Sequence, residues 1–336
     1  MNYILYNDFS QIQAQEWNEL LKESISDTPF LRYEYQQLWW QHRGGGEWKN
    51  AQLVLVAAQE GGKLIGIAPL FIAEYEGKPC LLLNGSIEIS DYLDVIVRKD
   101  DHAQFVSGLL DFLASTLADN WSSLDWYNLP DDSPTLAAFK AEAEKRGWTH
   151  LEEVYHPTPR IALNGNFDDY LLCIDKKQRH EIRRKMRRAA ESELNVRFVL
   201  VEQTAAIEPE LEAFFELMAH DPNKAQFLHP AMREQMTAFL RAAHEAGVLW
   251  LGFLEIDGVK TAASLNFDYN NKLWGYNSGV SRNHMELSPG WVLLAHTIQW
   301  CCENNRYEFD FMRGDEEYKY RLGGVNRFVM RAKLTR

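Results

Sequence analysis

The densest group of potentially reactive side chains follows Tyr307–Met312, a predicted strand near the C-terminus. Residues 313–319 read Arg-Gly-Asp-Glu-Glu-Tyr-Lys. Gly314 permits a sharp turn, which would crowd carboxylates, a phenol and an ammonium group at the carboxyl end of the strand, where open α/β sheets bind ligands. Such side chains exchange protons, so we predict part of an active site; the alternative is an Arg–Asp surface network that only fixes the turn. The candidate residues are Arg313, Asp315, Glu316, Tyr318 and Lys319.

A second group, Ser288-Pro289-Gly290, stands at the start of a predicted helix over Pro289–Asn304. Ser288 could cap this helix, and Pro289 favours its first turn. Gly290 has no side chain, so a ligand could approach the backbone there. Free N–H groups and the helix dipole attract anions at such a position. We therefore predict an anion site, although an ordinary helix start could show the same residues.

A basic helix is predicted around Lys176–Arg188, which contains eight Lys or Arg residues and one acid, Glu181. The whole chain carries a net charge of −13, so this positive charge is concentrated. It could be a solvated face paired with acids elsewhere, or a dock for CoA phosphates, a carrier protein, tRNA or an anionic membrane surface. Aromatic residues do not alternate with the basic ones, which disfavours single-stranded nucleic-acid stacking. The acidic balance argues against DNA binding.

Strands and helices that would position these groups alternate through two similar halves. A break at Pro157 and Pro159 predicts domains over residues 1–157 and 158–336. The hairpin Val54–Ile72 parallels Gly252–Phe267, which turns at Asp257-Gly258, and Leu124–Asp132 parallels Phe309–Glu317. We interpret this as a degenerate duplication of one α/β unit, although two unrelated α/β domains could share the order.

Composition excludes several classes of protein. The chain has 336 residues, 46% hydrophobic and 25% charged, which is typical of globular domains. Four cysteines cannot form a disulfide scaffold, and no Cys/His set has the spacing of a metal site. Serine-hydrolase, dinucleotide and P-loop motifs are missing as well. No signal peptide or long apolar run is evident. We therefore expect a cytoplasmic, reduced protein without metal.

Several motifs together resemble the GNAT acyltransferase superfamily, in particular its FemAB-like, CelD-like branch. They are KKQRHEIRRKMRR (176–188), LSPGWVLLAHTIQW (287–300), FDFMRGDEEYK (309–319), APLFI (68–72) and SDYLDVIV (90–97). The resemblance spans nearly the whole chain. It implies two tandem GNAT-like units, each a mixed, mainly antiparallel sheet flanked by helices, with a degenerate N-terminal unit on the acceptor side and the acyltransferase domain in the C-terminal half.

The resemblance also implies an activity: direct transfer of an acyl group from acyl-CoA, or another thioester, to an amine. The donor would bind at Ser288, Pro289, Gly290, Arg313 and Lys319. Glu316 or Asp315 would be the base, and Tyr318 or Tyr276 the acid. Residues 282–286 lack the glycine-rich pattern usual in the superfamily. Carrier-protein thioesters and aminoacyl-tRNA, both used among relatives, therefore stay open as donors, as does a non-catalytic anion-binding scaffold.

The acceptor would be a small-molecule, lipid or exopolysaccharide amine. In the first half, Asp91, Tyr92 and Asp94 could line a cleft between the domains and bind this cationic group; a capped loop leading into a strand is the alternative. Asp310 lies between two aromatic residues of its strand and so faces away from them. We count it with the first three as a candidate substrate ligand.

Overall fold

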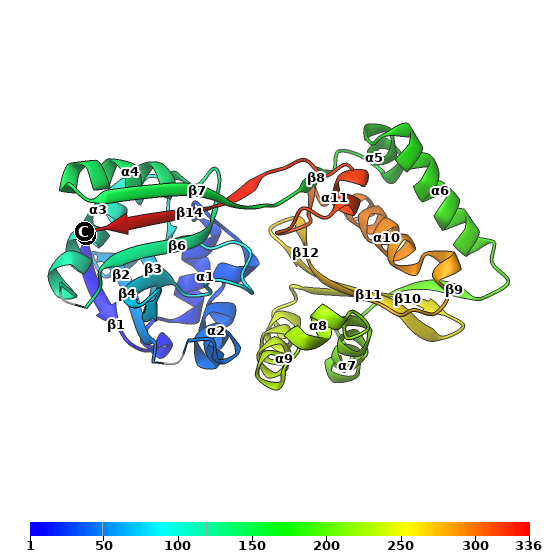
Figure 1. Ribbon diagram of the computed structural model, residues 1–336, viewed down its shortest axis with the longest axis horizontal. Helices are drawn as coiled ribbons and strands as arrows, with labels where there is room; N and C mark the ends of the chain where they lie inside the picture. Colours follow the sequence, from blue (N-terminus) through cyan, green and yellow to red (C-terminus); the bar gives the residue numbers. More distant parts are fainter. Residues whose placement is uncertain (49, 119) are drawn as a thin grey trace. The chain divides into compact units, whose positions relative to one another are not determined.

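The computed structural model describes residues 1–48, 50–118 and 120–336. The chain forms two compact units, Met1–Pro157 with Phe328–Arg336, and Thr158–Arg327 (Figure 1). The first division between the units falls after Pro157. The C-terminal segment differs from the prediction, because it lies in the N-terminal unit and not in the second domain.

The N-terminal unit is built on an eight-stranded sheet in the order β1-β2-β3-β4-β6-β14-β7, with β5 paired to β3. All neighbours are antiparallel except β4 and β6. The strands are β1 (Asn2–Tyr6), β2 (Gln52–Glu60), β3 (Lys63–Tyr75), β4 (Lys78–Leu83), β5 (Ile96–Val97), β6 (Ser123–Pro130), β7 (Thr149–Pro157) and β14 (Phe328–Thr335). The helices are η1 (Phe9–Gln11), α1 (Ala14–Lys22), η2 (Pro29–Leu31), α2 (Tyr33–Gly46), α3 (His102–Thr116) and α4 (Pro134–Arg146).

The C-terminal unit contains a six-stranded sheet in the order β8-β13-β12-β11-β10-β9, antiparallel except for β12 and β13. Figure 1 shows α7, α8 and α9 on one face and α5, α6 and α10 on the other. Its strands are β8 (Arg160–Ala162), β9 (Val196–Leu200), β10 (Leu249–Ile256), β11 (Val259–Tyr269), β12 (Lys272–Val280) and β13 (Glu308–Asp310). Its helices are α5 (Phe167–Cys173), α6 (Lys176–Ala190), α7 (Ile207–Met218), α8 (Pro222–Phe227), α9 (Pro230–Glu245), η3 (Met285–Leu287), α10 (Pro289–Glu303) and α11 (Glu317–Arg321).

Local chemistry explains many element ends. The side chain of Ser133 accepts a hydrogen bond from the Thr135 N–H at the start of α4, and Gly147 ends that helix in the left-handed region at φ 68°. Asp175 caps α6 through the N–H groups of Lys177 and Gln178. Asp257-Gly258 joins β10 to β11 with both residues at positive φ, as a type I′ turn requires.

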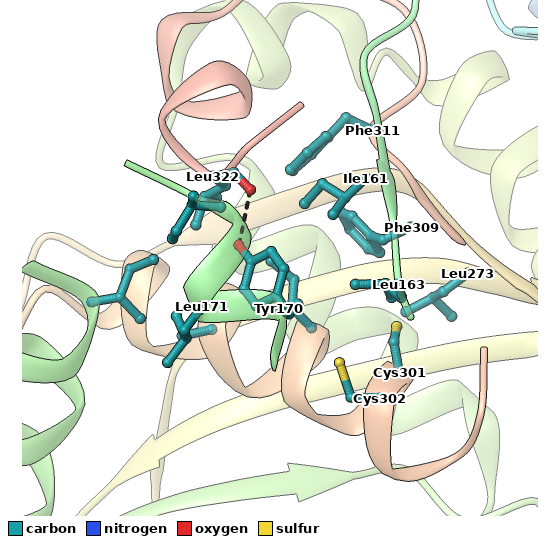
Figure 2. Packing of buried hydrophobic residues seen from close by; sticks show 14 of the residues in the cluster. Ile161, Leu163, Tyr170, Leu171, Leu273, Cys301, Cys302, Phe309, Phe311 and Leu322 are labelled. Atoms are coloured by element: carbon teal, nitrogen blue, oxygen red, sulfur yellow. Dashed lines mark hydrogen bonds between the residues drawn. The ribbon is translucent and has the colours of Figure 1, made fainter. Parts of the chain in front are cut away.

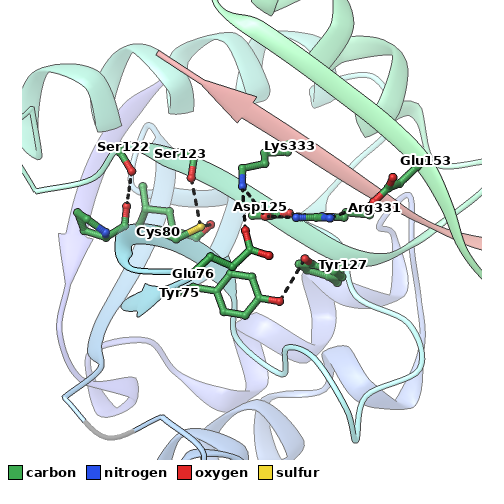
Figure 3. A network of polar contacts seen from close by, with 12 residues as sticks. Tyr75, Glu76, Cys80, Ser122, Ser123, Asp125, Tyr127, Glu153, Arg331 and Lys333 are labelled. Carbon is green, nitrogen blue, oxygen red and sulfur yellow. Dashed lines mark hydrogen bonds and ion pairs between the residues drawn. The ribbon is translucent and has the colours of Figure 1, made fainter.

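Each sheet buries an aspartate on the second strand of its parallel pair. In the N-terminal unit, Asp125 on β6 accepts two hydrogen bonds from Arg331, at 2.8 and 2.7 Å, and pairs with Lys333 at 3.1 Å, both on β14 (Figure 3). In the C-terminal unit, Asp310 on β13 lies 3.1 Å from the Arg160 guanidinium on β8. Both aspartates have zero exposure. This equivalence supports the duplication inferred from the sequence.

The core of the C-terminal unit joins α5, α10, β13 and the segment after α11. The Tyr170 hydroxyl donates to the Leu322 carbonyl at 2.9 Å, beside Phe309, Phe311 and Cys301 (Figure 2). This contact anchors the end of α11 and so supports the turn that precedes that helix. The four cysteines are free thiols. Among the described residues, no helix combines the length and apolar character that a membrane crossing requires.

Candidate active site

The central feature of the site is an open edge on β12. This strand pairs with β13 only over Lys272–Trp274. Beyond that point, within the described chain, no strand pairs with the same edge of residues 275–280. Tyr276 is an extra residue in the ladder with β11, and such a bulge bends a strand. We infer that the bulge turns β12 away from β13 and leaves its backbone accessible.

Side chains bond the backbone at this open edge. The Ser278 carbonyl accepts from the Lys224 ammonium at 2.7 Å, and the Ser278 N–H donates to the Asn277 side-chain oxygen at 2.8 Å. Lys224 lies on α8, and burial lowers its amine pKa despite the nearby charges of Asp221 and Glu316. These two backbone groups of Ser278 are therefore bonded to side chains and not to a neighbouring strand.

Sequence reasoning missed Lys224. In the structure the Asp221 side chain caps α8 by accepting from the N–H groups of Asn223 and Lys224, with Pro222 in the first turn. Asp followed by Pro is a helix-start signal, and it could have revealed this short helix.

The turn after β13 is held from inside by Lys319. Its side chain is 2% exposed, and its ammonium donates to the carbonyls of Arg313 and Gly314 at 2.7 and 3.2 Å and pairs with Glu316 at 2.9 Å. Met312, also buried, adopts a φ of 60° that non-glycine residues rarely take. The prediction of Lys319 as a donor ligand is therefore not supported, because its ammonium is buried against this turn. It positions Glu316 instead.

The turn presents three of the predicted catalytic side chains to solvent. Glu316 is 57% exposed, and Asp315 is exposed as well. Tyr318 is 39% exposed, and its ring stands edge-on to Phe311. Burial and the neighbouring Glu316 charge raise the pKa of Tyr318 to about 12, so its hydroxyl keeps its proton at neutral pH. Arg313 is half-buried in the same turn.

The fourth predicted catalytic residue, Tyr276, is partly buried on β12. Its ring packs against Phe239 of α9 and Phe267 of β11, at centroid distances of 5.7 and 5.3 Å. It therefore lies at the open strand edge but within an aromatic cluster, whereas Tyr318 lies on the turn beside Glu316.

The predicted acceptor ligands are all buried. Asp94 has zero exposure, and its carboxylate accepts hydrogen bonds from Ser26, Ser133 and Thr135. Asp91 and Tyr92 are 9% and 1% exposed. Asp310 has zero exposure and, besides pairing with Arg160, accepts from the Met312 N–H at 2.8 Å. Asp94 and Asp310 are thus corrected from substrate ligands to structural residues, because neither has a carboxylate oxygen facing solvent.

The start of α10 also differs from its prediction. Ser288 adopts φ 55° and ψ 55°, and its side chain makes no capping hydrogen bond. Val292 donates to the Ser288 carbonyl, whereas the amides of Gly290 and Trp291 have no partner within the described residues. A Cβ added at Gly290 would lie 3.1 Å from the Val280 side chain. The last residue of β12 and the free amides of α10 are therefore neighbours.

A pocket of about 410 Å³ lies beside this helix start. We call it the arginine pocket; it is lined by Arg184, Arg187, Arg188, Glu191, Ser192 and Leu287. Lys185 lies over the Trp291 ring at 4.3 Å and helps to hold α6 against α10. The basic helix and the Ser288-Pro289-Gly290 turn, recognised separately in the sequence, thus lie together.

Only part of the charge on α6 is neutralised. Arg183 pairs with Asp168 at 2.8 Å, and Arg184 and Lys185 pair with Glu181 at 2.7 and 3.6 Å. The other basic residues have no acidic partner in the described chain: Lys176, Lys177, Arg179, Arg187 and Arg188. The basic residues of α6 are therefore not all paired with acidic side chains.

Comparison with known proteins agrees with the architecture. A family model described as an acetyltransferase (GNAT) domain matches residues 176–320. A search of curated proteins gives no match. Among solved structures, FemX superposes with a TM-score of 0.70 at 12% identity, over 98% of this chain and 97% of FemX.

Two further structures are similar. L-PGS from Bacillus licheniformis has a TM-score of 0.57 at 10% identity, over 96% of this chain and 92% of its own. A tandem GNAT protein from the clavulanic acid biosynthesis pathway, solved without acetyl-CoA, has a TM-score of 0.51 at 12% identity, over 98% and 97% of the two chains. This chain therefore has the tandem GNAT, FemAB-like fold, and residues 176–320 of its C-terminal unit match the acetyltransferase (GNAT) domain model.

Proposed function

We propose that this tandem GNAT protein transfers an acyl group from acyl-CoA to a primary amine at the C-terminal unit. One observation carries the proposal. The open edge of β12 ends at Val280, and Val280 lies against Gly290, where α10 begins with free amides. A donor that joins a thioester to phosphates through an amide-containing arm fits such a path, because peptide groups can bond a strand edge while helix amides bind phosphate.

The reaction needs no covalent enzyme intermediate. The amine nitrogen attacks the thioester carbonyl carbon, the carbon–sulfur bond breaks, and the thiolate leaves with the bonding electrons. Glu316 is the proposed base that takes one proton from the incoming ammonium group, so that a neutral amine attacks. Tyr318 is the proposed acid that protonates the thiolate, and it regains a proton from the nitrogen as the tetrahedral intermediate collapses to the amide. Backbone N–H groups on β12 are suited to stabilise the tetrahedral oxyanion.

The acceptor side is acidic. Asp315 and Glu316 are both exposed on the turn after β13. Two neighbouring carboxylates attract a cationic amine, which increases its local concentration and favours its entry. This supports an amine acceptor, whether carried on a small molecule, a lipid or a sugar.

A second donor class is aminoacyl-tRNA. The observation that favours it is the set of unpaired basic residues at the start of α6, Lys176, Lys177 and Arg179, in a chain of net charge −13. Clustered cations bind nucleic-acid phosphates, and such binding weakens steeply with salt. A tRNA donor would need this end of the helix, whereas a CoA donor would need the α10 end.

Calorimetric titration with acetyl-CoA and a long-chain acyl-CoA, at low and moderate salt, tests the proposal. We expect saturable binding near one per chain, weakened at least tenfold in Gly290→Trp because the indole would cover the free amides. Ala231→Trp is the matched control, since Ala231 is exposed and also follows an N-terminal proline, in α9. Circular dichroism would verify the fold of both variants. Equal binding by both, or no binding by the unmodified protein, would overturn the CoA site.

A further inference from the structure

We propose that the arginine pocket binds the 3′-phosphate of the donor nucleotide, so that this protein selects CoA thioesters over their dephospho forms. The proposal rests on the proposed function, because it takes acyl-CoA as the donor. It adds a specificity site on α6. The rest of the donor is proposed to bind elsewhere, along the edge of β12 and at the start of α10.

The charges in the pocket fit a phosphate monoester. Arg187 and Arg188 have no acidic partner within the described residues, and Arg184 is exposed although it pairs with Glu181. A phosphate monoester carries about −1.5 to −2 charge at pH 7. Guanidinium groups bind phosphate oxygens with paired hydrogen bonds. Two unpaired arginines therefore match one such group in charge.

The rest of the lining favours a nucleotide over a free phosphate ion. Glu191 and Ser192 provide oxygen acceptors beside the arginines. A bare phosphate has no use for a carboxylate and would be repelled by it. A nucleotide has ribose hydroxyls and an exocyclic amine that can donate to these oxygens. A volume of about 410 Å³ also lies in the range of small-molecule sites.

The position of the pocket relates it to the proposed donor path. Leu287 forms part of its wall, and Gly290, with its free amide, lies in the first turn of the next helix in the same segment. Contacts between α6 and both η3 and α10 hold the arginines beside this turn. CoA carries a pyrophosphate and a separate ribose phosphate, so one molecule offers anions to both the helix start and the pocket.

Binding of CoA and dephospho-CoA tests the proposal, with adenosine 3′,5′-bisphosphate as a third probe. We expect CoA to bind at least tenfold more tightly than dephospho-CoA, and the double variant Arg187→Gln/Arg188→Gln to abolish this preference. Lys176→Gln/Lys177→Gln is the matched control, because it removes the same charge from unpaired residues at the other end of the same helix. That control should keep the preference.

The outcomes separate the two proposals. Equal affinity of the unmodified protein for CoA and dephospho-CoA would overturn the phosphate site and leave the acyl-CoA site standing. Loss of the preference in the lysine control would also overturn it, since the effect would then be general electrostatics. If CoA does not bind at all, the proposed function fails, and binding of the bisphosphate that disappears only in the arginine variant would still support the pocket. Binding of a CCA-ended RNA through the two arginines, without discrimination between the CoA forms, would overturn it.

Discussion

Each unit contains a parallel pair of strands. In the N-terminal unit this pair is β4 and β6, where Cys80 lies opposite Ser123 and Leu81 opposite Leu124. In the C-terminal unit it is β12 and β13, where Lys272 lies opposite Glu308 and Trp274 opposite Asp310. Beyond the first pair the chain itself occupies the gap. The Asn128 side chain on β6 donates to the carbonyls of Ile87 and Ser90, and the Leu93 N–H donates to the Asn128 carbonyl. Beyond the second pair, the described residues offer only side-chain partners, such as Lys224.

The segment that fills the first gap is packed as a core element. Ile87, Ile89, Tyr92 and Leu93 are each at most 6% exposed. Two acids, Asp100 and Asp101, also precede α3, the helix equivalent to α10, and negative charge there repels an anion. One copy of the fold is thus sealed and acidic where the other is open and basic, and this difference supports the proposal that the donor binds in the C-terminal unit.

The largest expected effect tests what the two copies share. Asp125→Ala would leave Arg331 and Lys333 without their buried partner, and breaking a buried pair costs about 3–5 kcal/mol. We expect Asp310→Ala to destabilise by a similar amount, because Arg160 loses its partner in the same way. Denaturant unfolding of both variants measures this. An Asp310→Ala protein of unchanged stability but weakened acceptor binding would restore Asp310 as a substrate ligand.

The second prediction concerns the open copy alone. Glu316→Gln keeps the size of the side chain but removes the proposed base, so kcat should fall about a hundredfold, equivalent to about 2.7 kcal/mol. Donor affinity should change little, because Glu316 lies on the turn and not at the α10 start. Glu317→Gln, on the neighbouring exposed residue, serves as the control. A full-rate Glu316→Gln enzyme would exclude Glu316 as the base.

The smallest effect tests the sealed copy. Ile89→Val removes one buried methyl group from the segment that fills the gap, which should cost about 1 kcal/mol of unfolding free energy. Donor affinity should stay the same, since the segment that fills this gap is predicted to have only a structural role. A changed dissociation constant for acyl-CoA would show that the N-terminal unit contributes to donor binding after all.

The sequence predicted the frame of this molecule better than its site. Turn and capping residues placed the Asp257-Gly258 turn between β10 and β11 and the start of α10 at Pro289. The short elements β1, β8, α8 and α11 were missed, because a few residues carry too little periodic signal. In the motif at 90–97 only Ile96–Val97 form a strand, because the residues before them fill the gap beside β6.

Site residues were harder to assign because residue type does not reveal burial. Asp94 and Asp310 have the same chemistry as Glu316, yet they lie inside hydroxyl and arginine networks formed by distant segments. Lys319 and Lys224 show that residue type alone can both suggest a site residue wrongly and miss one. The first was expected at a ligand and supports a turn; the second carried no motif and lies at the open strand edge.

The place of β14 has a consequence for how the chain is made. It pairs with both β6 and β7, so the N-terminal sheet remains divided until synthesis has passed Phe328–Thr335. Thr158–Arg327, by contrast, contains every strand of its own sheet. On the ribosome, which produces about 5–20 residues per second, the unit that emerges first is the last that can close. Asp125 is translated long before Arg331, its partner in the folded sheet. The half of the protein that is translated first is therefore the half that a chaperone can bind for the longest time.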